Sequence, residues 1–94
     1  MKIIKVQTQE KDYNGIPYTE YKIYGLQNGN NVIVTCSGSV ETLLVEEETG
    51  TICASGPLKS IVLKAGDDIA VWRNESTGKV QEIDVYMKAE VPLS

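Results

Sequence analysis

The chain has 94 residues, a net charge of −4 and 41% hydrophobic residues, and it contains neither histidine nor phenylalanine. This length predicts a single domain spanning residues 1–94. Arg73 is the only arginine, and the lysines are too scattered to form the basic patch that a nucleic-acid partner requires. Without histidine, neither a Ser–His–Asp nor a Cys–His arrangement can form within the chain, so we expect no catalytic residues and no enzyme.

Residues 2–8 alternate between apolar and polar side chains and predict a first strand. Residues 9–17 are expected to form a loop, because Asn14-Gly15 and Pro17 favour turns. The chain is therefore predicted to leave its first strand after about seven residues.

Asn28-Gly29 lies between two further alternating runs, residues 18–26 and 31–36. An Asn-Gly pair in this setting predicts a hairpin with a two-residue turn. That register gathers Tyr21, Ile23, Val32, Val34 and Cys36 on one face. It directs Tyr18, Glu20, Lys22 and Tyr24 to the other face.

A second hairpin is predicted from residues 40–47 and 51–54, joined around Thr49-Gly50. In this register Leu43, Val45, Ile52 and Ala54 share a face. The acidic clusters Glu46-Glu47-Glu48 and Asp67-Asp68 match no calcium-loop spacing and are expected to remain solvated at turns.

The last third of the chain predicts a three-stranded meander from residues 59–63, 67–73 and 79–89, with a tail at 90–94. Gly66 and Gly78 are expected to adopt positive φ in its two loops. The register that these two loops set places the following residues on the core face: Ile61, Leu63, Ile69, Val71, Ile83, Val85 and Met87. The opposite face is expected to carry Val62, Ala70, Trp72, Val80, Glu82, Asp84 and Tyr86.

Together these runs predict an all-β fold of about eight short strands, arranged as an antiparallel β-sandwich or jelly roll. Cys36 and Cys53 lie within apolar runs and are expected to be free, buried thiols, although the sequence does not show whether they are bridged. No signal peptide or transmembrane segment is recognised, so we expect a cytoplasmic protein or one assembled into a particle.

The exposed aromatic and aliphatic residues away from the core face form the candidate interaction surface. Its members are Leu58, Val62, Trp72, Val80, Tyr86, Tyr18 and Tyr24. We expect a non-enzymatic structural or interaction module that binds protein, namely copies of itself, such as a subunit of a phage particle or fibre. Truncation of Trp72 should then weaken self-association.

Two alternatives remain open at this point. A Tyr/Trp pair in a groove would indicate a module that binds carbohydrate or another ligand. The acidic charge is compatible with a small inhibitor of a basic protein partner, whose binding would depend strongly on salt. The composition indicates no cofactor, no metal ligands, no nucleic-acid partner and no membrane partner.

Overall fold

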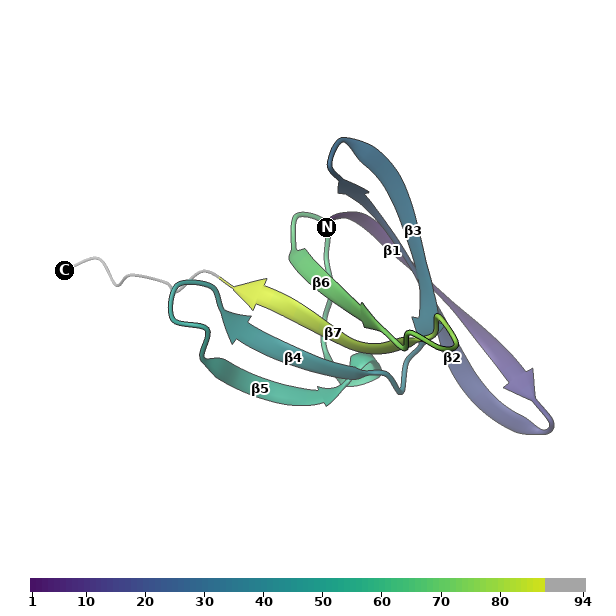
Figure 1. Cartoon of the computed structure of the whole chain (residues 1–94). Coiled ribbons are helices and arrows are strands. Elements are labelled where there is room, and N and C mark those ends of the chain that lie inside the picture. Colours follow the sequence, from purple (N-terminus) through teal and green to yellow (C-terminus); the bar gives the residue numbers. More distant parts are fainter. Residues whose placement is uncertain (88–94) are drawn as a thin grey trace.

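A computed structural model describes residues 1–87 as a single seven-stranded mixed β-sheet with the strand order β3-β2-β1-β6-β7-β4-β5 (Figure 1). The strands are β1 (Lys2–Tyr13), β2 (Ile16–Gln27), β3 (Asn30–Ser37), β4 (Glu41–Glu46), β5 (Ile52–Pro57), β6 (Asp68–Arg73) and β7 (Val80–Met87). A short 3-10 helix, η1 (Leu58–Ser60), follows β5. The predicted all-β class is confirmed. The predicted sandwich or jelly-roll arrangement is not, because the strands form one open sheet.

The hairpin of β2 and β3 has the predicted register. Asn28 and Gly29 adopt φ values of 52° and 79°, as a two-residue turn between right-twisted strands requires. Ile23 therefore pairs with Val34, and Tyr21 pairs with Cys36. Local turn chemistry is sufficient to determine which side chains of this hairpin enter the core.

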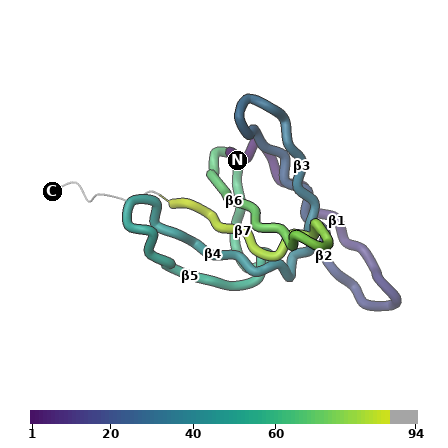
Figure 2. Tube along the Cα trace, viewed as in Figure 1, coloured from purple at the N-terminus to yellow at the C-terminus, as the bar shows by residue number. Residues whose placement is uncertain are grey.

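The loop predicted at residues 9–17 is instead the tip of a long hairpin. Asn14 and Gly15 repeat the positive φ values of the other Asn-Gly turn, and the Asp12 carboxylate accepts the Gly15 N–H at 2.7 Å. Two residues suffice for the turn, so β1 and β2 stay paired as far as Tyr13 and Ile16. The tip extends beyond β3 as a two-stranded ribbon, which projects from the body in Figure 2. This projection fits the elongated shape of the molecule, which measures 54 × 29 × 25 Å.

The strand predicted at residues 59–63 is absent. The segment forms η1 and an irregular connection, because the start of β1 occupies the edge of β6 that this strand would have used. Ile3 donates its N–H to the Asp67 carbonyl and accepts the Gly66 N–H, each at 2.8 Å. Gly66 has the predicted positive φ, at 95°, but it turns the chain into β6 from a non-strand segment.

The β6–β7 hairpin confirms the predicted pairing of Ile69 with Val85 and of Val71 with Ile83. A β-bulge next to Trp72 and Arg73 shifts the register, so that Arg73 pairs with Val80. Val80 consequently packs against the core and not on the face of Trp72, which corrects its predicted placement. Residues 88 and 89 of the predicted last strand, and the tail at 90–94, lie outside the described residues.

Strand β4 runs parallel to β7, a pairing that the sequence did not predict. Thr42 lies opposite Ile83 and Leu44 opposite Val85, so these two β4 residues face the core. The prediction had placed Leu43 and Val45 on the same face as Ala54. Val45 pairs with Ile52, so their predicted shared face is confirmed, but a bulge at Cys53 lets Ala54 pair with Leu44 on the opposite face.

The two halves of the sheet, β3-β2-β1 and β6-β7-β4-β5, share one hydrophobic core. They are joined in register only at Lys2 and Asp68. The buried cluster draws on both halves and on η1, and it consists of Ile3, Ile23, Val34, Leu58, Ile69, Ile83 and Val85. The sheet bends at this junction (Figure 1), so one core forms without a second sheet.

Candidate interaction surfaces

The residues predicted to form one surface do not lie together. Leu58, the first residue of η1, is fully buried in the core, which removes it from any exposed surface and corrects the prediction. Val62 is 85% exposed on the connection before β6, and Trp72 is 54% exposed on β6. Tyr86 is half-buried on β7. The predicted surface thus divides between separate parts of the molecule.

Trp72 lies on the outer face of β6 and is fixed by a carboxylate of the neighbouring strand. Its Nε1–H donates to Asp84 Oδ2 at 3.0 Å. The hydrogen bond between Glu82 and Asp84 raises the pKa of Glu82, and burial and the negative charges of Asp84 and Glu41 act in the same direction. This outer face is therefore a locally acidic surface with one ordered indole ring.

The aromatic side chains do not form the Tyr/Trp pair that would indicate a sugar site. Trp72 pairs with Glu82, whereas Tyr86 pairs with Asp68, four residues further along β6. That offset corresponds to roughly 13 Å along the strand. Tyr24 lies on β2 in the other half, where its ring contacts the Lys5 ammonium at 4.7 Å and its hydroxyl donates to Gln7 at 3.1 Å.

Tyr18 also lies on β2, as predicted, on the same face as Tyr24. It pairs with Lys11 in the ribbon formed by β1 and β2. Its side chain is half-buried and lies six residues from Tyr24 along the strand. The two tyrosines are therefore separated along β2 and do not converge on one site.

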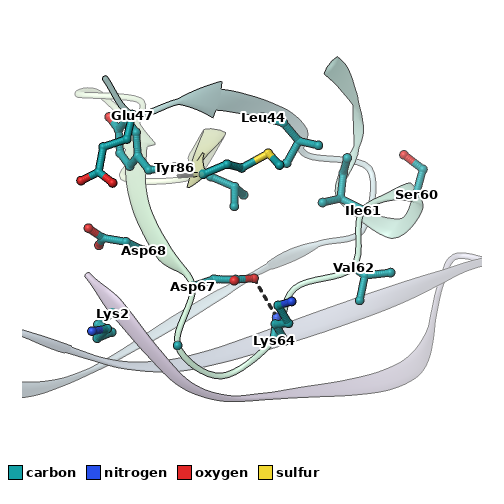
Figure 3. A pocket seen from close by; sticks show the side chains of 13 residues that line it. Lys2, Leu44, Glu47, Ser60, Ile61, Val62, Lys64, Asp67, Asp68 and Tyr86 are labelled. Carbon is teal, nitrogen blue, oxygen red and sulfur yellow. Dashed lines mark hydrogen bonds between the residues drawn. The ribbon is translucent and has the colours of Figure 1, made fainter. Parts of the chain in front are cut away.

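A groove of about 860 Å³ opens between the connection that precedes β6 and the ends of β4 and β7. It contains two of the predicted surface residues, Val62 and Tyr86. Figure 3 shows Glu47 and Asp68 at one side of the groove, and Ile61 and Val62 at the other. The remaining lining residues are Lys2, Leu44, Ser60, Lys64, Gly66, Asp67, Val85 and Met87.

The charged groups of this groove serve the local structure. Asp67 Oδ2 accepts the Lys64 backbone N–H at 3.0 Å and closes the loop before β6 (Figure 3). Asp68 Oδ1 lies 3.3 Å from the amino group of Met1. Charges of both signs line the groove, and Asp67 and Asp68 are already engaged in these local contacts. Its geometry therefore indicates no particular ligand.

The two edge strands of the sheet are more informative. Strand β3 forms one edge, and its eight residues contain no charge and no proline. Its ladder with β2 is continuous from Asn30 to Ser37, without a bulge. Ile33, in the middle of this strand, is 57% exposed. Natural edge strands usually carry a charge, a proline or a bulge that prevents pairing with other strands, and β3 has none of these.

The backbone of β3 presents unpaired groups at alternate residues. Gln27 and Asn30 flank a two-residue turn and so exchange hydrogen bonds, and Gly38 continues this alternation by donating to the Thr19 carbonyl at 2.8 Å. Asn31, Ile33 and Thr35 therefore direct their N–H and C=O groups away from β2. No other segment within residues 1–87 pairs with this edge.

Strand β5, at the opposite edge, also lacks charged residues but is protected in other ways. It has six residues, a bulge at Cys53 and a proline at its end, Pro57. Leu58 donates its N–H to the Val40 carbonyl at 2.8 Å. Because inward and outward N–H groups alternate along an antiparallel ladder, Ser55 directs its N–H outward. The β5 edge thus offers little continuous backbone for pairing.

Each edge strand carries one free cysteine. Cys36 on β3 is half-buried and Cys53 on β5 is exposed, so the predicted free thiols are confirmed, whereas the predicted burial of Cys53 is wrong. Burial raises the pKa of the Cys36 thiol to about 11, against a smaller lowering by the Arg73 guanidinium. Cys36 is therefore protonated and a poor nucleophile at neutral pH.

Within residues 1–87, no cluster of three or more acidic or cysteine side chains is arranged to hold a metal ion. No helix in this part of the chain has the length and apolar character needed to cross a bilayer. Comparison of the chain with protein-family models, with curated proteins and with solved structures finds no match. The inference of function therefore rests on the geometry of the sheet.

Sequence reasoning did not single out β3 as a functional element. The signal was present, since residues 30–37 form the longest uncharged strand within residues 1–87. Its meaning depends on position, because an uncharged strand in the middle of a sheet is ordinary. Only the strand order shows that β3 lies at an edge.

Proposed function

We propose that the protein is a non-enzymatic interaction module that works as a homo-oligomer, and that copies associate through the β3 edge. The observation that carries this proposal is an edge strand of eight residues without charge, proline or bulge, with Ile33 exposed at its centre. Strand addition at such an edge supplies backbone hydrogen bonds together with side-chain contacts on both faces.

The surroundings of β3 support this proposal. Ile33 pairs across the ladder with Tyr24, and Leu26, the next residue but one along β2, is 43% exposed. An added strand would place side chains beside Ile33 on this face and extend the core face that Val32 and Val34 already occupy. A closed oligomer would also remove the risk of uncontrolled aggregation at an open edge.

The setting that we propose is a symmetric assembly, such as a phage particle or fibre, in which this chain is a structural subunit. Small β domains bury limited apolar surface on their own, and association adds to it. In such an assembly the groove and the acidic outer face of Trp72 would remain available for contacts with other components.

Sedimentation equilibrium between low and high micromolar concentration tests the proposal. We expect a homo-oligomer whose association constant changes little between about 0.05 and 0.5 M salt, because no charged residue lies on β3. A chain that stays monomeric throughout would contradict the proposal. Association that weakens steeply with salt would also contradict it and would favour an interface built from charged groups.

A further inference from the structure

Building on the proposed self-association, we infer that the interface is a twofold one, in which β3 pairs antiparallel with β3 of a second copy about an axis at Ile33. The occupant of the edge is thus a second copy of this chain, and the pairing has one defined register. The direction of the backbone groups and the order of side chains along β3 both select this register.

The backbone allows only certain registers. The groups of Asn31, Ile33 and Thr35 point outward, so a hydrogen-bonded pair across the axis must join two of these residues. Centring the axis on Ile33 pairs Asn31 with Thr35 of the second copy, Ile33 with its own equivalent, and Thr35 with Asn31 of the second copy. These three pairs exchange about six N–H···O bonds.

The side chains favour the same register, because the strand is chemically symmetric about Ile33. Reading outward in either direction, Ile33 is followed by a valine and then by a polar residue. Antiparallel pairing centred here therefore places polar beside polar and β-branched beside β-branched side chains. Val32 meets Val34 of the second copy on the core face, which extends the apolar surface of both copies.

Other symmetric registers are less favourable. Moving the axis to Val32 places Ile33 opposite Asn31 of the second copy. The next hydrogen-bonded pair would then need Gly29, which lies in the turn with a φ of 79°. Moving it to Val34 places Ile33 opposite Thr35 and uses Ser37, whose carbonyl already accepts the Val40 N–H. Each shift loses a hydrogen-bonded pair and mismatches an apolar side chain.

Disulfide trapping tests the register in the full chain with both native cysteines replaced, Cys36→Ala and Cys53→Ala. In that background, Ile33→Cys should form a disulfide-linked dimer, because Cα atoms of a hydrogen-bonded antiparallel pair lie about 5.5 Å apart. Asn31→Cys alone and Thr35→Cys alone should not cross-link, since each lies about 14 Å from its own equivalent.

An equimolar mixture of the Asn31→Cys and Thr35→Cys proteins should cross-link, and this experiment keeps Ile33 intact. Mass spectrometry of the cross-linked peptides should identify a bond between positions 31 and 35. A cross-link between positions 31 and 33, or between 33 and 35, would overturn the inferred register. The absence of any cross-link in a protein that sedimentation shows to be oligomeric would overturn it too. Both outcomes leave the proposed self-association standing. A monomeric parent protein would instead overturn the proposed function itself.

Discussion

The two edges of the sheet, β3 and β5, carry equally uncharged sequences and yet differ in the backbone that they expose. Strand β3 is long and regular, and it presents outward groups at Asn31, Ile33 and Thr35. Strand β5 is short and bulged, and it ends at Pro57. Strand regularity therefore determines how much unpaired backbone each uncharged edge exposes.

The largest effect is expected from a charge placed on each edge in turn. Ile33→Lys should reduce the association constant by about 100-fold or more, because two ammonium groups would be buried beside each other at the twofold axis. Ile52→Lys is a matched control on β5, since Ile33 and Ile52 are 57% and 58% exposed. It should leave association within about twofold, as measured by sedimentation equilibrium. Equal losses in both variants would mean that the edges do not differ.

The alkylation rates of the two cysteines give a chemical comparison of β3 and β5. At pH 8, Cys36 in the Cys53→Ala protein should react with iodoacetamide about 100-fold more slowly when folded than in urea, because its pKa is raised from 9.0 to about 11. Folding favours the protonated Cys36 thiol, so its contribution to stability should be lost as the pH rises from 9 toward 11. Exposed Cys53, in the Cys36→Ala protein, should react at a similar rate folded and unfolded. Fast labelling of folded Cys36 would contradict its burial.

Replacing one glycine in each half of the sheet tests how much room the packing leaves for an added Cβ. A Cβ at Gly25 on β2 would lie 2.7 Å from the Lys2 carbonyl oxygen and 2.7 Å from Met1 Cγ, so Gly25→Ala should lower the free energy of unfolding by about 1–3 kcal/mol. At Gly56 on β5 the Cβ meets only the Ser60 Oγ, at 3.0 Å, and Gly56→Ala should cost less. Urea denaturation at one protein concentration measures both. A larger loss at Gly56 would reverse the comparison.

Proline tests the outward N–H groups directly. Thr35→Pro should leave the monomer folded, because this N–H makes no bond to β2, and it should weaken association about tenfold through two lost hydrogen bonds. Ser55→Pro is the corresponding change on β5 and should leave association unchanged. Circular dichroism checks the fold, and sedimentation measures association. Unchanged association of the Thr35→Pro protein would exclude backbone pairing at β3.

The smallest effect is expected at Trp72. The indole is bound to Asp84 on the outer face of β6, and it supplies none of the backbone groups of β3 that would pair with a second copy. Trp72→Ala should therefore change the association constant by less than about twofold. A loss of about 30-fold, corresponding to ~2 kcal/mol, would place the interface on the face that the sequence had first suggested.

Much of the local structure could be predicted from the sequence. The registers of the β2–β3 and β6–β7 hairpins followed from Asn28-Gly29 and from the glycine at position 78, which has a φ of 72°. The bulges could not be predicted in this way, and they moved Val80 to the core face and Ala54 off the face that Val45 and Ile52 share. A bulge reflects packing against the partner strand, which alternation along one strand does not contain.

The sequence by itself determined the all-β class, the tight turns and the absence of charge along residues 30–37, because these depend on residues close together in the chain. Only the tertiary structure decided that β1 takes the edge of β6, that β4 runs parallel to β7, and that β3 is left at the end of the sheet. Those outcomes are competitions between distant segments for the same backbone groups. The shared core around Ile23 and Ile83 determines which pairing is most stable.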